Sequence, residues 1–113
     1  MEVAAQNGTQ RPGLNGCARI VARQTLAQYG VAGLRGRWWE VFRPTGVPGV
    51  VVRIDKSERI RVKLQVIAET DANLAETGLH ITRAVRRALA EEARVDVAWI
   101  SIAFVGINRR WKS

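Results

Sequence analysis

The residues able to perform catalysis are few and isolated in this chain. His80 is the only histidine and Cys17 the only cysteine. His80 lies four residues after Glu76 on the polar side of an expected helix, which favours a solvated surface pair over a general base. Cys17 has no base nearby in the sequence, so a buried thiol is favoured over a nucleophile. We therefore expect no catalytic residue and no enzyme activity.

Motifs for metals and cofactors are also missing from the sequence. One histidine and one cysteine do not make a zinc ligand set, and no P-loop ending in Gly-Lys-Ser/Thr is present. Gly33-Leu-Arg-Gly36 has the spacing of the Gly-Xaa-Xaa-Gly clamp of some RNA-binding domains. That clamp joins two helices, whereas this segment precedes an expected strand, so a helix cap and turn are favoured. We expect no metal and no cofactor.

Positive charge is the strongest chemical signal in the sequence. The 113 residues include 18 Lys and Arg against 10 Asp and Glu, which gives a net charge of +8. Bases exceed acids by three in residues 46–67 and again in 99–113, whereas residues 68–98 carry two more acids than bases. This distribution predicts an anionic partner, bound outside the second helical region.

The basic residues are expected on one face of a sheet. In residues 59–69 apolar side chains alternate with Arg59, Arg61, Lys63 and Gln65, so one sheet face is apolar and the other basic. This basic face could bind an RNA backbone, anionic lipid head groups or an acidic protein, or be only solvated. The residues expected to bind a partner or nucleic acid are Arg53, Arg61, Lys63, Trp99, Trp38, Trp39, Arg109, Arg110 and Lys112.

The pattern of apolar residues predicts two helices and four strands. A helix is expected over 17–29, with Leu26 and Tyr29 on its buried face and Gly30 as its C-terminal cap. A strand is expected over 38–43, then a hairpin of strands 50–55 and 59–69, and a last strand over 97–107. Between the last two strands lies a second helix, capped by Asp71 or Asn73.

These elements predict an α+β fold. We expect a two-layer sandwich, in which both helices pack on one face of a mixed sheet of about four strands. The two strands that flank the second helix should run parallel, as in other strand–helix–strand crossovers. Residues 1–16 are expected to be a flexible leader, 17–107 a single domain and 108–113 a basic tail. Trp38 and Trp39 are adjacent, so in a strand at least one of them is exposed.

The sequence favours a cytoplasmic protein. Residues 1–9 contain an acidic residue and no apolar core of signal-peptide length. The longest nearly apolar run, 97–107, is shorter than the roughly 20 residues that a membrane-spanning helix needs. We therefore expect no integral membrane segment, and any membrane contact would come through a partner.

The chain resembles the alkaline shock protein family of small bacterial proteins. The resemblance runs from Cys17 to Ile107 and rests on Tyr29-Gly-Val-Ala-Gly-Leu34, Gly49-Val-Val-Val-Arg-Ile54, Val66-Ile-Ala-Glu69 with Asn73 after it, and Phe104-Val-Gly-Ile107. Tyr29 stands where the family usually has proline, and this chain is more basic than many relatives. The resemblance implies a non-catalytic domain of the cell-envelope stress response that associates with itself and is held near the cytoplasmic membrane by a membrane-anchored partner.

Two functions therefore follow as expectations. The first is a self-associating scaffold protein, whose copies meet through sheet edges or through the basic sheet face. The second is an RNA- or DNA-binding module that uses the basic, tryptophan-containing face, with an affinity that falls as salt rises.

Overall fold

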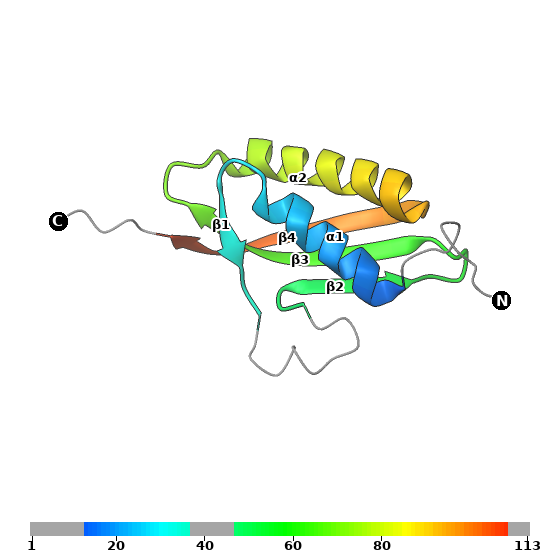
Figure 1. The fold of residues 1–113 in the computed structure, drawn as a ribbon. Helices are drawn as coiled ribbons and strands as arrows, with labels where there is room; N and C mark the ends of the chain where they lie inside the picture. The colour runs from blue at the N-terminus through cyan, green and yellow to red at the C-terminus, as the bar shows by residue number, and fades with distance from the viewer. Residues whose placement is uncertain (1–12, 37–46, 109–113) are drawn as a thin grey trace.

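Two helices cover one face of a sheet in the computed structural model, which describes residues 13–36 and 47–108. The elements are α1 (Leu14–Leu26), β1 (Val31–Leu34), β2 (Val50–Ile54), β3 (Ile60–Glu69), α2 (Leu74–Ala88), the π-helical turn η2 (Leu89–Ala93) and β4 (Val97–Asn108). Figure 1 shows α1 and α2 side by side over the strands. The predicted α+β sandwich, with both helices on one face of a mixed sheet, is confirmed.

β3 is the central strand, and it is paired along both of its edges. Along one edge it runs parallel to β4, from Ile60 opposite Val97 to Glu69 opposite Asn108. Along the other edge it pairs antiparallel with both β1 and β2. The predicted parallel arrangement of the strands that flank α2 is therefore confirmed.

β1 and β2 together fill a single strand position beside β3. The N–H of Arg35, just after β1, donates to the carbonyl of Gln65 at 2.9 Å, and the N–H of Gln65 donates to the carbonyl of Gly49 at 2.9 Å. In a regular antiparallel ladder one residue would exchange both hydrogen bonds with Gln65. Here the two bonds are divided between Arg35 and Gly49, so the chain leaves the strand after Arg35 and rejoins it at Gly49.

The core lies between the helices and the apolar side of β3. The side chains of Val62, Leu64 and Val66 are at most 1% exposed, and the residues between them in the strand are exposed. Against them pack Val21 of α1 and Val85 of α2, which are also fully buried. Burial of side chains of this size stabilises the fold by about 1.5–3 kcal/mol each.

The first helix begins and ends earlier than its apolar pattern predicts. It starts at Leu14, inside the expected leader, and ends at Leu26 rather than Tyr29. The Gln28 side chain donates to the carbonyl of Gln24 at 3.0 Å, which satisfies one of the last carbonyls of the helix. Tyr29 is 89% exposed, because helical spacing no longer applies beyond Leu26, and Leu26 itself is 50% exposed, so their predicted burial is wrong.

A strand follows α1 where a helix cap and turn were expected. Gly30 has the predicted positive φ, +93°, but it lies at the corner before β1 and not at the helix end. Its carbonyl accepts from the N–H of Glu69 at 2.8 Å, which begins the pairing of β1 with β3. Gly33 therefore lies within a strand and not in a turn. The strand expected over 38–43 lies outside the described residues.

The second helix is close to the prediction. Asn73, one of the two expected caps, accepts a hydrogen bond from the N–H of Glu76 at 3.0 Å. Its buried residues include Ile81 and Val85, as predicted, whereas Leu74 is 40% exposed. The helix continues into η2, which the sequence did not indicate, and Arg94 ends it with a φ of +55°.

The strands after residue 47 lie within one residue of their predicted bounds. β2 ends at Ile54 and β3 begins at Ile60, joined by the expected turn, in which the Asp55 carboxylate accepts from the N–H of Ser57. Residues 109–113 of the expected tail and 1–12 of the expected leader lie outside the described residues. Among the residues that the structure describes, no helix is both long and apolar enough to span a membrane.

Gly49 should be essential for the junction between β1 and β2. Its φ is +80°, and a Cβ placed on it would lie 2.8 Å from the carbonyl oxygen of Arg35. Strain at such a φ costs about 1–3 kcal/mol before any clash. We expect Gly49→Ala to lower the thermal midpoint by about 10 °C. Gly33→Ala is the control, since a Cβ there meets nothing within 4 Å. Equal midpoints for the two variants would contradict this account of the junction.

Cys17 should make stability depend on pH in the alkaline range. The side chain is 1% exposed, and burial raises the pKa of its thiol above the ordinary 9.0. Above pH 9 the unfolded chain releases a proton that the folded chain keeps, so the free energy of unfolding falls as pH rises. Urea unfolding near pH 7 and pH 10 should show a smaller loss for Cys17→Ala than for the wild type. The same loss in both proteins would argue against a neutral buried thiol.

Candidate functional site

The side of the sheet that faces away from the helices, here called the open face, carries three of the predicted binding residues in one row. Arg53 of β2 lies directly opposite Arg61 of β3, which lies opposite Trp99 of β4. The guanidinium carbon of Arg61 lies 4.7 Å from the centre of the Trp99 ring, a cation–π distance. The alternation in the sequence predicted that these residues share one face, and the register of the strands places them in one row.

Lys63 lies in the next row of the open face, between Val51 and Ser101. The following row pairs Gln65 with Ala103. The side chains of Arg53, Arg61 and Lys63 are all exposed. None of the residues on this face from Arg61 to Ile67, nor their partners on β2 and β4, is acidic.

Two carboxylates near this end of the sheet are bonded to other groups. Asp55 accepts hydrogen bonds from the backbone N–H groups of Ser57 and Arg59, at 2.8 and 2.9 Å. Asp96 forms an ion pair with the Arg59 side chain at 3.0 Å. Within the described part of the chain, no ion pair or hydrogen bond neutralises Arg53, Arg61 or Lys63.

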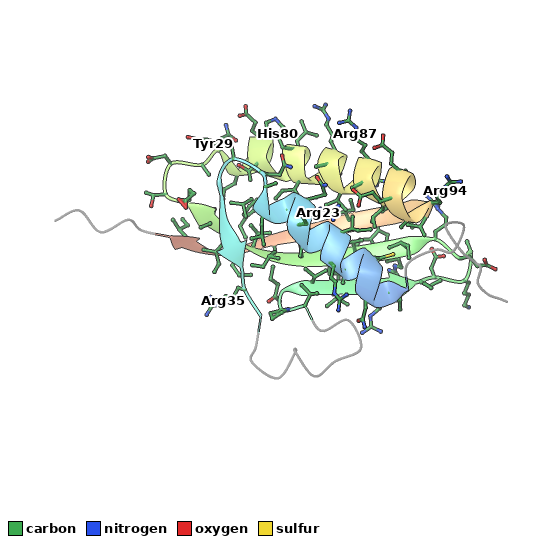
Figure 2. All side chains as sticks on the ribbon, in the orientation of Figure 1. Arg23, Tyr29, Arg35, His80, Arg87 and Arg94 are labelled. Atoms are coloured by element: carbon green, nitrogen blue, oxygen red, sulfur yellow. The ribbon has the colours of Figure 1, made fainter. Side chains whose placement is uncertain are left out.

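Arg35 adds a fourth cation to the open face, and the sequence analysis did not select it. Its side chain donates to the carbonyl of Val105 at 3.1 Å, so it crosses from the β1 position over β3 to β4. Figure 2 shows Arg35 at the end of β1, apart from the labelled residues of the two helices. Arg35 stands in the Gly33–Gly36 segment, which we assigned to a turn, and only a strand there places it on this face.

The remaining predicted binding residues lie outside the described part of the chain. They are Trp38, Trp39, Arg109, Arg110 and Lys112. The structure therefore brings Arg53, Arg61, Lys63 and Trp99 together on one face. For the other five residues the prediction stays untested.

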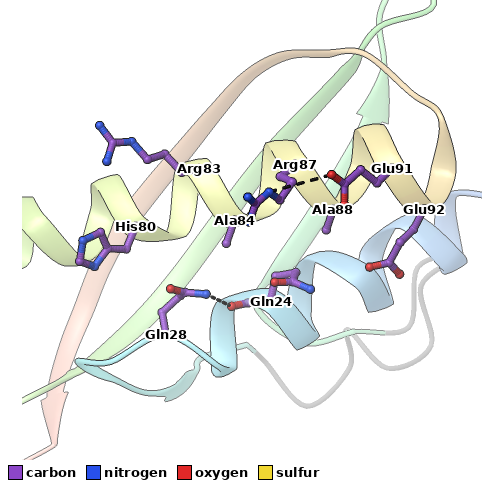
Figure 3. Close-up of a pocket in the computed structure, with 9 residues that line it drawn as sticks. All are labelled: Gln24, Gln28, His80, Arg83, Ala84, Arg87, Ala88, Glu91 and Glu92. Atoms are coloured by element: carbon purple, nitrogen blue, oxygen red, sulfur yellow. Dashed lines mark hydrogen bonds and ion pairs between the residues drawn. The ribbon is translucent and has the colours of Figure 1, made fainter.

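The histidine lies on the other side of the molecule, in a groove between the helices. His80 is exposed, and with Gln28, Arg83 and Arg87 it lines a groove of 590 Å³ (Figure 3). The acids that line this groove are in ion pairs, Glu91 with Arg87 and Glu92 with Arg23. A histidine flanked by arginines and open to water lacks the shielding that a general base needs.

Cation ligands do not gather elsewhere in the described structure. Within residues 13–36 and 47–108, no group of three or more His, Cys, Asp or Glu side chains could hold a metal ion. The buried thiol of Cys17 lies in the core beside Val21 and not in a groove.

The β4 edge is a second surface that could contact another molecule. Among the described strands, β4 pairs only with β3, and its 12 residues include no charged side chain. Ile100, Ile102 and Phe104 pack against the core but remain partly exposed, whereas their three partners on β3 are at most 1% exposed. The helix layer therefore covers β4 incompletely.

The comparisons with known proteins do not extend this description. No family model matches the chain, and no curated protein or solved structure is significantly similar to it. The resemblance to the alkaline shock proteins thus rests on the quoted sequence segments, and the function has to be argued from the open face and the β4 edge.

Proposed function

We propose that the protein is a non-catalytic interaction protein whose copies associate by pairing their β4 edges. The observation that carries this proposal is the combination of a 12-residue uncharged strand at the sheet edge with half-exposed Ile100, Ile102 and Phe104. An edge strand offers backbone N–H and C=O groups to another strand, and natural sheets usually protect such edges with charges, prolines or bulges. β4 has no charge and no proline, although its register with β3 is irregular at two places, between Val97 and Trp99 and between Phe104 and Gly106.

The two edges of the sheet differ in a way that favours β4. The opposite edge is divided between β1 and β2, and β2 carries Arg53. A second chain pairing there would meet a gap in the strand and a like charge. β4 is continuous, so two copies related by a twofold axis could pair their β4 strands antiparallel and shield the half-exposed apolar side chains of both.

The open face is a poor surface for contact between copies. Stacking two open faces would bring Arg53, Arg61 and Lys63 of each copy against the same cations of the other. Like charges that face each other across a contact cost roughly several kcal/mol. Of the two self-association routes expected from the sequence, the sheet edge is therefore the one proposed.

The proposed absence of catalysis rests on where the reactive side chains lie. His80 is open to water beside two arginines, and the Cys17 thiol is buried with a raised pKa, which keeps it in the unreactive neutral form. The remaining part of the proposal comes from the resemblance to alkaline shock proteins. On this basis we propose that the protein is a cytoplasmic scaffold of the envelope-stress type, held near the membrane by a membrane-anchored partner.

Self-association should depend on concentration and should be lost when β4 is charged. Sedimentation velocity should show a dimer, and Ile102→Lys should be monomeric because a lysine at the edge opposes strand pairing. Ile102 is partly exposed, so the new ammonium can reach water without entering the core. Ser57→Lys, which adds the same charge in an exposed turn, is the control and should still dimerise.

Hydrogen exchange gives an independent measurement if Ile102→Lys disturbs the fold. Amides of β4 in the wild type should exchange more slowly at high than at low protein concentration, with no such change in β2. A wild-type chain that stays monomeric at about 1 mM, where an interaction of only about 4 kcal/mol would be populated, rules out the proposal.

A further inference from the structure

The strongest unexplained feature of the molecule is the pairing of Arg53 with Arg61. The two residues lie directly opposite each other on neighbouring antiparallel strands. Like charges in this position destabilise a sheet, whereas opposite charges stabilise it. Lys63 lies one row away, and no acidic residue of the described strands lies among them. Such a local conflict is typical of a site whose missing partner is an anion.

Two arginines of the helix layer lie beside acids. There Arg23 is in an ion pair with Glu92, and Arg87 lies 4.0 Å from Glu91. His80, Arg87 and Arg23 lie on the two helices in Figure 2, and Arg35 lies apart from them at the end of β1. Within the described residues Arg53, Arg61 and Lys63 have no acidic partner, and all three lie on the open face.

The open face also contains a stacking element. The Arg61 guanidinium lies over the Trp99 ring, with its central carbon 4.7 Å from the ring centre. Its other side is available to a second flat group, since Arg61 is exposed. Nucleic acid bases stack on aromatic rings and on arginine planes in this way, and a base can do so only when it is not enclosed in a duplex.

The cations extend along the sheet and are not gathered at one point. Arg61 lies near the start of β3, with Arg53 of β2 opposite it, and Lys63 follows two residues later. The Arg35 side chain crosses the sheet near the other end of β3, where it donates to the carbonyl of Val105. At about 3.3 Å per residue, the distance along β3 from Arg61 to Ile67 is about 20 Å. The charges therefore suit an extended anionic chain better than a single small anion.

We propose that the open face binds single-stranded nucleic acid. Arg35, Arg53 and Lys63 contact successive phosphates, and a base stacks on the Arg61 guanidinium above Trp99. Gln65 and Ser101, which lie between the cations, supply polar groups for sugar or base edges. A lipid surface fits less well, because the Trp99 ring is covered by Arg61 and is not available to insert among head groups.

The test measures binding of the full chain to a fluorescein-labelled oligouridylate of about 12 nucleotides, a typical length for one such face. Three phosphate contacts predict that affinity falls about 20-fold between about 50 and 200 mM salt. The double variant Arg61→Gln/Lys63→Gln should bind about 25-fold more weakly near 0.1 M salt and should show a shallower salt dependence.

A matched double variant controls for net charge. Arg19→Gln/Arg83→Gln removes two exposed arginines from the helices and should change the affinity little, because the helices lie on the other side of the sheet and salt screens exposed charges over about 10 Å. An equal loss in both double variants would show attraction by overall charge and would overturn the proposal.

Arg61→Lys separates stacking from charge. It keeps the cation but removes the planar group over Trp99, so affinity should fall at least about fivefold while the salt dependence stays the same. Thermal unfolding of each variant shows whether it is folded. An Arg61→Lys affinity equal to that of the wild type would remove the stacked base from the proposal.

Two further ligands identify a different partner. Heparin carries negative charge but no bases, and vesicles of phosphatidylserine and phosphatidylcholine represent an anionic membrane. The proposal expects the oligonucleotide to bind more tightly than either at the same salt concentration. No binding of the oligonucleotide at about 50 mM salt, where electrostatic contacts are strong, or tighter binding of heparin or vesicles, overturns it.

Discussion

The structure depends on the alternation of side chains along β3. Because β3 is hydrogen-bonded along both edges, its side chains can point only toward the helices or away from them. A slip of one residue would put Arg61 and Lys63 into the core and expose Val62 and Leu64. The alternation along β3 therefore does two things: it buries the apolar side chains in the core, and it places the cations in rows on the open face.

A second constraint acts on the backbone, where the chain leaves and rejoins the strand position next to β3. Gly49 lies so close to Arg35 that a side chain would not fit, and its φ favours glycine. Gly30 plays the same part at the corner after α1, where a Cβ would lie 2.6 Å from the Thr77 hydroxyl oxygen of α2. These two glycines let one broken strand edge close against β3, and they bring Arg35 over the open face.

The two proposed surfaces are compatible with each other. A twofold axis perpendicular to the sheet would pair the β4 edges antiparallel and keep both open faces on the same side of the dimer. In these proposals the charge on the open face would direct self-association to the edge, and pairing at the edge would leave the face free for an anionic partner. Each surface therefore has its own residues: Ile102 and its neighbours at the edge, and Arg53, Arg61 and Lys63 on the face.

The sequence by itself determined the elements with strong periodicity. The alternation around Arg61 and Lys63 predicted a two-sided strand, and the cap at Asn73 with the stripe through Ile81 and Val85 predicted α2. Trp99 was placed on the open face by the same period of two. These predictions succeeded because side-chain direction in a long strand or helix is set locally, by backbone geometry.

Only the tertiary structure decided the short elements and the edges. Val31–Leu34 is four residues long and forms a strand because β3 offers it hydrogen bonds, which no local pattern reveals. The end of α1 before Tyr29, the shared position of Arg35 and Gly49 beside Gln65, and the half-exposure of the β4 side chains likewise depend on which segments meet. Contacts between residues far apart in the chain set these features, so they could not be read from the residues in sequence order.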